Sequence, residues 1–533
     1  MTETSNKIDT PMAKAVLDAY RAGEEDEAMN PILLADENGG PVGRIQDGDY
    51  VIFYDIRGER EIQLTECLTD PAFSHFDTGG MTSRFVTMIE YDKKLDAKVA
   101  FEPQPVPVNT LVEMVSKAGL KTLKLVETEK AVHLGYFLNG KRENPYDGEE
   151  HRFTHSLKVD DFSQYPKMSV EEVCDSVVGA IGDDDHDLII ANFANVDVIG
   201  HIENHDAVVT AVETVDSCVG KVVEAARKAG REVVITADHG SAERWLYPDG
   251  KVDTGHTDSL VPFIYIGEGT VDGKPPVLRS TGALTDVAPT ILEIMGIEKP
   301  AEMTGESFFD RSAGKVDFKK PKRKALLMIA DGWGYREEKE GNLIAEAHTP
   351  NMDGFLAERP FTTIAASGEA VGMPEGTVGN SEAGHLHMGV GRVVYSDRLR
   401  IDRALEDGSY ATNPAFLWAI EGAKKENKPL HLLGIVSFYS SHGSLHHLLK
   451  LMKMASDHGI NEVYIHSLLG RRGERPEAGA RYIADVEEEG RKLGVGTVVS
   501  VMGRFWALDR EYNWDRIEKT YRCLVNGEGT KVN

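Results

Sequence analysis

Short apolar runs bounded by turn residues alternate along the chain with segments in which apolar residues recur at helical spacing. Continuous apolar strands between helices are typical of a largely parallel sheet that is covered on both faces. The pattern predicts strands at 187–193, 231–237, 261–266, 325–330 and 432–436. It also predicts helices at 207–229 and 284–295, each followed by a glycine that can end a helix. The sequence therefore predicts an α/β protein.

The length and one polar segment indicate how the chain is divided. A chain of 533 residues is long enough for several domains. Residues 312–324 are polar, rich in lysine and interrupted by Gly314 and Pro321, so this segment is predicted to be a linker. The apolar strand at 325–330, which ends in Asp331, follows it directly. That order is typical of a domain start, here placed in the middle of the chain.

The composition narrows the choice of partners. The 87 acidic residues outnumber the 59 basic ones, which gives a net charge of −28. Such a surface repels nucleic acids and anionic membranes, so an anionic substrate needs a local basic pocket. The four cysteines are scattered without a C-x-x-C pair, which fits a reducing compartment. We find no secretory signal and no membrane-spanning run, and we expect a cytoplasmic monomer.

Three apolar strands are each followed by an aspartate, and histidines lie near two of these aspartates. In parallel sheets, ligands gather at the carboxyl ends of strands. A single aspartate there is usually a turn former or a helix cap, but three of them with histidines indicate a divalent metal site. The carboxylates are Asp331, Asp197 and Asp238, and the imidazoles are His201, His239 and His256.

The motif at 378–385 (VGNSEAGH) places Ser381 after small residues, at a predicted helix start. Backbone N–H groups and the helix dipole at such a point favour a phosphate. A metal-bound serine there is a candidate nucleophile. The alternative is that Ser381 is only a helix N-cap, with Glu382 in the first turn.

Arginines near predicted strand ends are candidates for binding an anion. They occur in three groups, Arg57 with Arg60, Arg471 with Arg472, and Arg504 with Arg510. The alternative for each group is an ordinary surface salt bridge.

These motifs together resemble the 2,3-bisphosphoglycerate-independent phosphoglycerate mutases of the alkaline-phosphatase superfamily. The family's opening segment resembles residues 326–334 and 370–385. Its later segment resembles residues 127–130, 192–201, 236–240 and His256. Because the later segment comes first here, the chain resembles a circular permutant whose old ends are joined at 312–324.

The resemblance implies two domains. A phosphatase-like metal-binding domain would span 105–394, and a substrate-binding α/β domain would be assembled from 395–533 plus 1–104. Two stretches of chain would link them, near 101–108 and near 393–396, and these are hinge candidates.

The resemblance also implies residue roles. One metal would be bound by Asp331, Ser381, Asp238 and His239, and the other by Asp197, His201 and His256. Mn²⁺ is the expected metal, with Mg²⁺, Co²⁺ and Zn²⁺ as alternatives. Ser381 would form a phosphoserine, His442 would transfer a proton, and Lys130 would hold a phosphate oxygen. The substrate-binding arginines would be Arg57, Arg60, Arg472, Arg504 and Arg510.

The implied activity is the interconversion of 3-phosphoglycerate and 2-phosphoglycerate. The sequence departs from the family at 470–473, which reads GRRG in place of DGRD, and at 437–440, which reads SFYS in place of SDGG. Gly470, Gly473 and Phe438 therefore motivate an alternative, a metal-dependent phosphomonoesterase that does not retain glycerate. The full metal-ligand set argues against a non-catalytic scaffold, and the setting of Ser381 argues against a sulfatase-like enzyme.

Overall fold

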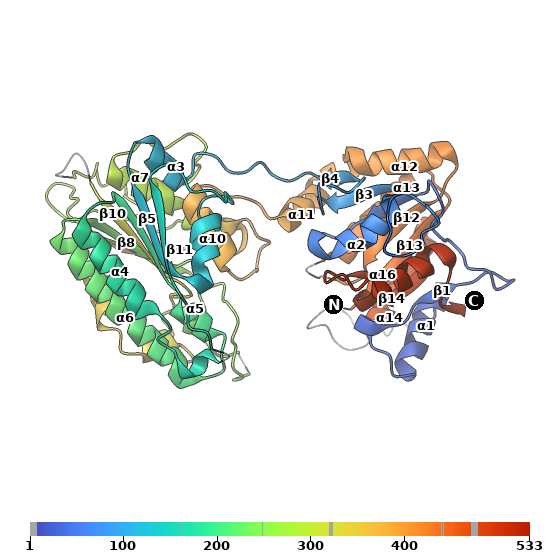
Figure 1. Cartoon of the computed structure of the whole chain (residues 1–533), viewed down its shortest axis with the longest axis horizontal. Coiled ribbons are helices and arrows are strands. Elements are labelled where there is room, and N and C mark those ends of the chain that lie inside the picture. Colours follow the sequence, from blue (N-terminus) through green and yellow to red (C-terminus); the bar gives the residue numbers. More distant parts are fainter. Residues whose placement is uncertain are drawn as a thin grey trace. The chain divides into compact units, whose positions relative to one another are not determined.

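The computed structural model describes residues 8–159, 161–247, 249–318, 323–438, 440, 442–470 and 478–533. The chain divides into two compact units (Figure 1). Unit 1 consists of Met1–Gln104 and Arg400–Asn533, and unit 2 consists of Pro105–Leu399. The second crossing between the units falls within helix α11 (Asp397–Asp407), a few residues after the predicted boundary at 394.

Unit 2 contains a seven-stranded sheet in the order β11-β9-β8-β10-β7-β5-β6. All neighbours pair in parallel except β9, which runs antiparallel to both β8 and β11. Every residue of the central strands is buried, as expected for strands that are covered on both faces. The strands are β5 (Thr122–Glu127), β6 (Glu149–Thr154), β7 (Leu188–Phe193), β8 (Glu232–Thr236), β9 (Val261–Ile266), β10 (Ala325–Ala330) and β11 (Phe361–Ile364).

Helices cover both faces of this sheet (Figure 1). One face carries α4 (Val170–Asp183), α6 (His205–Lys228) and α9 (Pro350–Glu358). The other carries α3 (Leu111–Lys117), α7 (Val287–Met295) and α10 (Ser381–Val390). The short helical elements are η2 (Thr128–Lys130), η3 (His133–Phe137), η4 (Phe162–Gln164), α5 (Asn195–Gly200), η5 (Ala242–Arg244), η6 (Leu284–Asp286), α8 (Leu343–Glu346) and η7 (Gly368–Val371).

Unit 1 contains an eight-stranded sheet in the order β15-β1-β14-β13-β12-β2-β3-β4. Its strands pair in parallel except β1, which is antiparallel to β14. Segments from both ends of the chain therefore form one sheet. The strands are β1 (Ile32–Leu34), β2 (Tyr50–Phe53), β3 (Arg84–Ile89), β4 (Lys98–Phe101), β12 (Leu430–Ile435), β13 (Val463–Leu469), β14 (Thr497–Gly503) and β15 (Thr530–Val532).

Two separate apolar cores lie on the two faces of the unit 1 sheet. One core is formed with α1 (Pro11–Arg21), α12 (Pro414–Glu426), α13 (Leu445–Asp457) and α14 (Gly479–Leu493). The other is formed with α2 (Gly58–Thr69) and α16 (Trp514–Tyr521). The remaining elements are η1 (Asp26–Ala28), η8 (Ser409–Thr412), α15 (Arg504–Ala507) and η9 (Arg522–Asn526).

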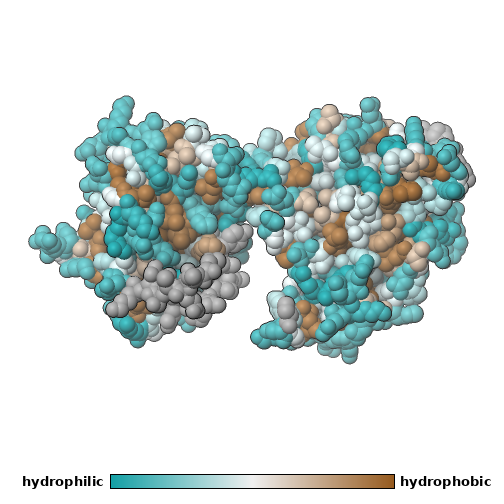
Figure 2. Space-filling view, turned by 180° about the vertical axis from the view of Figure 1, so that it is seen from behind, coloured by the Kyte–Doolittle hydropathy of each residue, from teal (hydrophilic) through white to brown (hydrophobic). Residues whose placement is uncertain are grey.

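The predicted fold class is confirmed, because both units are α/β with sheets that are mostly parallel. The five predicted strands and the two predicted helices are also confirmed, with ends that differ by up to two residues, and the second helix begins with the 3₁₀ turn η6. Hydrophilic residues cover much of the face that Figure 2 shows. None of the described helices combines the length and the apolar character that crossing a membrane requires.

Candidate metal centre and nucleophile

The candidate metal ligands meet because the strands that carry them are neighbours in the unit 2 sheet. β10 lies between β7 and β8, with Ala330 paired to Phe193 and Ile329 paired to Thr236. Asp331 directly follows β10, and Asp238 and His239 follow β8. Residues far apart in the chain are thus placed at one edge of the sheet, at the carboxyl ends of parallel strands.

Asp238, His239 and Asp331 form one compact group of fully buried ligands, with ligand atoms within 4.8 Å of one another. His239 Nε2 lies 3.5 Å from an oxygen of each carboxylate. Burial alone would lower the pKa of His239, but Asp238, Asp331 and Asp197 raise this pKa to about 9. The group therefore attracts a positive charge.

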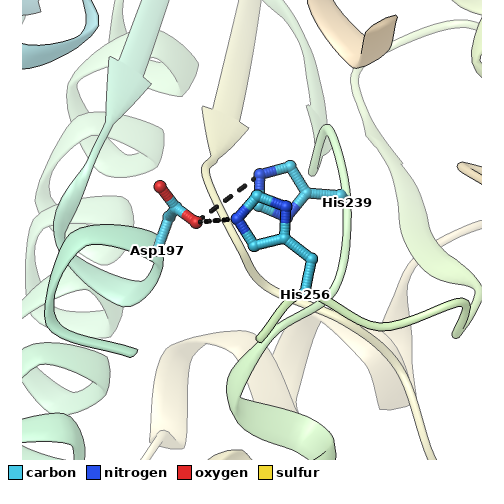
Figure 3. A group of neighbouring side chains, drawn as sticks. All are labelled: Asp197, His239 and His256. Atoms are coloured by element: carbon cyan, nitrogen blue, oxygen red, sulfur yellow. Dashed lines mark ion pairs between the residues drawn. The ribbon is translucent and has the colours of Figure 1, made fainter. Parts of the chain in front are cut away.

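A second group contains Asp197, which lies in α5 after β7, together with His239 and His256 (Figure 3). His256 Nε2 lies 3.0 Å and His239 Nε2 lies 3.6 Å from Asp197 Oδ1, and the two imidazole rings are stacked. His201 Nε2 lies 3.0 Å from His256 Nε2 and 3.4 Å from Asp197 Oδ1. His239 thus faces both groups, although the sequence assigned it to one.

The hydrogen bonds of these histidines fit metal ligation. Nδ1 of His201 lies 2.8 Å from the Thr254 carbonyl, and Nδ1 of His256 lies 2.9 Å from the Gly379 carbonyl. Because a carbonyl only accepts, each Nδ1 carries a hydrogen, and the two Nε2 atoms face each other. Within the described part of the chain, Asp197 Oδ1 receives no hydrogen bond. Two imidazole nitrogens and one carboxylate oxygen that converge in this way are a suitable ligand set for a divalent cation.

The hydrogen bonds of the first group, Asp238, His239 and Asp331, also fit metal ligation. Nδ1 of His239 donates to the Gly240 carbonyl at 3.2 Å, which directs Nε2 toward the carboxylates. Among the described residues, Asp238 Oδ2 has no hydrogen-bond partner although it is buried. A buried carboxylate oxygen without a partner is costly unless a cation neutralises it. The residues present therefore fit a second divalent cation.

Ser381 is the first residue of α10, as the sequence predicts. The helix cap is Asn380, whose side chain accepts a hydrogen bond from the Ala383 N–H at 2.8 Å, so the alternative of Ser381 as an N-cap is wrong. Ser381 Oγ lies 3.0 Å from His239 Nε2 and 3.4 Å from Asp331 Oδ1. The hydroxyl is therefore placed at the candidate metal ligands rather than used for capping.

Lys130, in η2 after β5, extends its ammonium group into the same cluster. Its Nζ lies 2.6 Å from Ser381 Oγ, 2.6 Å from Asp197 Oδ2 and 2.9 Å from Asp331 Oδ1. Burial opposes its charge, but Asp331 and Asp197 raise the pKa of Lys130 above its ordinary value. Lys130 is therefore a buried cation that neutralises part of the carboxylate charge.

Two polar residues of the cluster were not predicted from the sequence to take part in it. Asn192 Nδ2, at the end of β7, donates to Asp331 Oδ2 at 2.8 Å and lies 3.0 Å from His385 Nε2. His385 Nδ1 lies 2.9 Å from the Ser381 carbonyl and 3.3 Å from Asp238 Oδ2. Both residues lie within the motifs that resemble the family. Their positions could have indicated a role in the site, since Asn192 lies near the end of β7 and His385 lies one helical turn after Ser381.

His442, the predicted proton-transferring residue, lies in unit 1, in the loop between β12 and α13. It is buried, and its Nδ1 lies 2.8 Å from Oε1 of the buried Glu61. Burial lowers the pKa of His442 to about 4, with Arg504, Arg57 and Arg60 acting in the same direction against the charge of Asp55. The imidazole is therefore neutral at neutral pH.

The predicted substrate-binding arginines in the described residues also lie in unit 1. Glu59 Oε1 bonds both Arg57 Nε, at 2.9 Å, and Arg510 Nη1, at 3.1 Å. Arg60 Nη1 donates to the Leu508 carbonyl at 3.0 Å. Arg504 Nη2 lies 3.1 Å from Glu27 Oε1, and Arg472 lies outside the described residues. Burial lowers the pKa of Arg60, and the charges of Arg510, Arg504 and Arg57 lower it further, so the four guanidinium groups form one electropositive cluster.

Gly470 has a physical reason to be a glycine. Its φ is +102°, and a Cβ there would lie 2.6 Å from the Glu27 Cα in η1. A side chain at this position would therefore be both strained and blocked. Gly473 lies outside the described residues, and Phe438 is 57% exposed on the surface of unit 1.

Two family models match the chain. The model described as the metalloenzyme superfamily matches residues 26–299, which is more than half of the chain. The model described as the BPG-independent PGAM N-terminus matches residues 401–533. A model named for an N-terminus thus matches the last part of this chain.

Several relatives are named 2,3-bisphosphoglycerate-independent phosphoglycerate mutase. The Clostridium novyi protein is 42% identical over 57% of this chain and 59% of its own length. The proteins of Methanococcoides burtonii and Listeria monocytogenes are 41% and 40% identical, over 55% and 57% of this chain and 56% and 59% of their own lengths. The chain thus spans less than two thirds of the length of these relatives. A solved structure of Leishmania mexicana phosphoglycerate mutase at low cobalt concentration has a TM-score of 0.36 and 27% identity, covering 52% of this chain and 53% of that chain.

The two family-model matches and the sequence relatives confirm that the motifs resemble those of the phosphoglycerate mutases. The larger of the two model matches includes Asp197, His201, Asp238, His239 and His256. The chain belongs to the metalloenzyme superfamily.

Proposed function

We propose that the chain interconverts 3-phosphoglycerate and 2-phosphoglycerate through a phosphoserine on Ser381, using two divalent ions, of which Mn²⁺ is the expected species. The observation that carries the proposal is the setting of Ser381 Oγ, which lies within 3.4 Å of Lys130 Nζ, His239 Nε2 and Asp331 Oδ1. The names of the relatives support the same reaction. Asp331, Asp238, His239 and Ser381 would hold one ion, and Asp197, His201 and His256 would hold the other.

The bound ions would lower the pKa of the Ser381 hydroxyl and offset charge on the transferring phosphoryl group. Lys130 would hold a phosphoryl oxygen, because its ammonium lies 2.6 Å from Ser381 Oγ. Asn192 orients Asp331 through the hydrogen bond between them. The chain's own residues thus supply the nucleophile, its orientation and a fixed positive charge.

Isomerisation also requires that glycerate stays bound while the phosphoryl group is on Ser381. Arg57, Arg60, Arg504 and Arg510 would bind the carboxylate and phosphate of the substrate, as guanidinium groups do for both anions. His442 would move a proton at the reacting hydroxyls. Exclusion of water from the phosphoserine would separate isomerisation from hydrolysis.

The chain order supports a second part of the proposal, that the sequence is circularly permuted relative to the family. The model named for an N-terminus matches 401–533, after the superfamily match at 26–299. The old ends would be joined near 312–324, of which residues 319–322 lie outside the described residues.

The test is a product assay on the purified full chain with 3-phosphoglycerate and a panel of Mn²⁺, Mg²⁺, Co²⁺ and Zn²⁺. We expect 2-phosphoglycerate to form, and Ser381→Ala to abolish it while leaving the melting temperature of the metal-free protein near that of the wild type. Inorganic phosphate without 2-phosphoglycerate would establish the phosphomonoesterase alternative instead. Neither product, from a folded and metal-loaded protein, would refute the proposed function.

A further inference from the structure

Unit 1 contains a buried acidic cluster around His442. Asp55 follows β2, Glu61 lies in the first turn of α2, and His442 lies in the loop after β12, which pairs with β2. Glu61 and Asp55 are fully buried and His442 is 1% exposed. One ligand atom of each lies within 4.8 Å of the others, and His442 Nδ1 lies 2.8 Å from Glu61 Oε1.

Two buried carboxyl groups this close do not both ionise readily. Burial raises the pKa of Glu61, and burial together with the charge of Glu61 raises the pKa of Asp55. Asp55 Oδ1 accepts a hydrogen bond from the Ile435 N–H at 2.8 Å, whereas Oδ2 has no partner among the described residues. Both carboxyl groups therefore hold a proton more tightly than a free carboxyl group does.

The charges around the cluster disfavour a divalent metal ion. The guanidinium groups of Arg57, Arg60 and Arg504 lower the pKa of His442, so they act as nearby positive charges. Such charges repel a divalent cation but stabilise an ionised carboxyl group. Among the described residues, the titratable groups that face His442 and Glu61 are Asp55, Arg57, Arg60, Arg504 and Tyr91.

We infer that Glu61 is a positioning residue that exchanges a proton with Nδ1 of His442, so that Nε2 can act in turn as acid and base while the imidazole stays neutral. This inference rests on the proposed function and adds to it, because the resemblance supplies a histidine but no partner for it. It also gives unit 1 a carboxyl pair beside His442, although the motif at 470–473 lacks both family carboxylates.

The proton balance is complete without another reactant. In the first transfer Ser381 Oγ reacts as the alkoxide. The bond from phosphorus to the C3 oxygen breaks, a bond from phosphorus to Ser381 Oγ forms, and Nε2–H gives its proton to the C3 oxygen. Nδ1 then takes the proton of the Glu61 carboxyl group, which becomes a carboxylate. In the second transfer the C2 hydroxyl attacks phosphorus and gives its proton to Nε2, the bond from phosphorus to Ser381 Oγ breaks to return the alkoxide, and Nδ1 returns its proton to Glu61.

A neutral imidazole explains why the partner is needed. A histidine whose pKa is lowered to about 4 is not an imidazolium at neutral pH, so it cannot give up a proton without passing through a costly anion. The Glu61 carboxyl group removes that cost, because it supplies a proton to Nδ1 as Nε2 loses one. The 2.8 Å distance between Oε1 and Nδ1 fits one direct hydrogen bond.

The test compares Glu61→Gln and Glu61→Asp with the wild-type full chain, loaded with Mn²⁺ and assayed for conversion of 3-phosphoglycerate. We expect Glu61→Gln to lower kcat about 10²-fold or more, with KM within about twofold of wild type, because an amide holds the ring but passes no proton. Glu61→Asp keeps the carboxyl group but shortens the side chain, so its kcat should lie between those of the other two.

A spectroscopic readout separates relay from simple packing. With ¹⁵N-labelled histidine, the signals that disappear in His442→Asn identify His442. Glu61→Gln should shift the ratio of its Nδ1–H and Nε2–H tautomers. Asp49→Asn is the matched control, because Asp49 is buried in the same unit and contacts His431 Nε2 at 3.3 Å, and it should change neither kcat nor the His442 signals.

The outcomes distinguish this inference from the proposed function. If the wild type makes no 2-phosphoglycerate, the proposed function fails first. If the wild type isomerises and folded Glu61→Gln keeps its kcat or its His442 tautomers, the relay alone is refuted. Loss of one bound Mn²⁺ in Glu61→Gln, measured by calorimetry, would also refute it by making the cluster a metal site. If Glu61→Gln does not fold, the kcat and the His442 tautomer ratio of Glu61→Asp test the relay instead.

Discussion

At the scale of single residues, Lys130 shows how this site balances its charge. Its ammonium lies within 2.9 Å of two carboxylate oxygens, one from Asp197 and one from Asp331. An ammonium and a divalent ion both satisfy buried carboxylates, so the site has two ways to offset the same charge. The balance between them can be tested by removing the lysine.

Lys130→Met should destabilise the metal-free protein by about 3–5 kcal/mol, because it leaves buried carboxylates without their cation. Mn²⁺ should restore most of that loss, since ions bound to the native state then offset the same charges. The measurement is the melting temperature in chelator and in Mn²⁺.

Lys124→Met is the matched control for this prediction. Lys124 is fully buried in the same unit, and its Nζ lies 2.8 Å from Glu149 Oε1, in a pair without candidate metal ligands. Its destabilisation should be the same with and without Mn²⁺. An equal loss for Lys130→Met in both conditions would contradict the assigned role of Lys130.

His387, in α10, should make the protein sensitive to acid. Burial lowers its pKa from 6.5 to about 4. Between these two pH values the unfolded chain binds a proton that the folded chain excludes. The free energy of unfolding is therefore unaffected by His387 above pH 6.5 and decreases as the pH falls toward 4. The loss is worth about 3 kcal/mol by pH 4.

Urea unfolding at several pH values measures this effect. His387→Gln should remove the part of the slope of unfolding free energy against pH that His387 causes. His442 and His133, whose pKa values burial also lowers to about 4, should keep their shares in that variant. A His387 ring that titrates near pH 6.5 by NMR would contradict the prediction.

At the scale of elements, sequence patterns predicted the strands well and their neighbours poorly. The apolar run at 325–330 predicts β10 with the bounds that the structure shows, because six consecutive apolar residues suit a strand buried on both faces. Nothing local in that run places β10 between β7 and β8, which precede it by about a hundred residues or more. Contacts that depend on this order, such as Asn192 with Asp331, could not be predicted from spacing.

The shared position of His239 and the pairing of Glu61 with His442 were also beyond the sequence. His239 was assigned to one ion through its motif, but its ring reaches both ligand groups because α5 brings Asp197 beside it. Glu61 is one of many glutamates in a helical pattern, and only the closeness of β2 and β12 brings it to His442.

The packing of α10 against Asp238, which follows β8, predicts the effect of one added methyl group. A Cβ on Gly384 would lie 2.4 Å from the Asp238 carbonyl oxygen and 2.7 Å from the Asp238 Cβ. Gly384→Ala should therefore move α10 and displace Ser381 from the carboxylates, at a cost of about 1–3 kcal/mol. Activity and stabilisation by Mn²⁺ should both fall, as measured by the product assay and by melting with and without metal.

Gly179→Ala provides the comparison in α4. Gly179 has nothing within 4 Å of a Cβ, so alanine there should stabilise the helix by about 0.5–1 kcal/mol and leave activity unchanged. Unchanged activity and metal response in Gly384→Ala would show that Ser381 does not depend on this contact.

At the scale of the whole molecule, chain order and spatial order differ. Unit 1 is assembled from both ends of the chain, and β15 near one end pairs with β1 near the other. The sequence resemblance indicated two domains, since the matching motifs occur in a rotated order. The unit boundary inside α11 was not predicted, because the helix continues across it without a break in its pattern.

A chain in the order that the resemblance implies should fold and function like this one. It would begin at Arg323, continue through Asn533 and a flexible linker to Ile8, and end at Phe318. The new join would connect close neighbours, because α1 contacts β15. The new ends would also lie close together, because the Arg323 guanidinium lies 4.2 Å from the centre of the Phe318 ring. We expect a similar melting temperature and a similar rate of 2-phosphoglycerate formation, because native contacts are retained and only loop entropy changes.

A second rearranged chain with the same linker, opened between Phe193 and Ala194, is the control for this prediction. That cut separates β7 from α5 and frees Asp197 from the strand end that positions it beside His239 and His256. The control should lose activity and Mn²⁺ stabilisation even if it folds. Equal loss in both rearranged chains would mean that the segment around 312–324 is needed for more than connection, and the proposal that it joins two former ends would then be wrong.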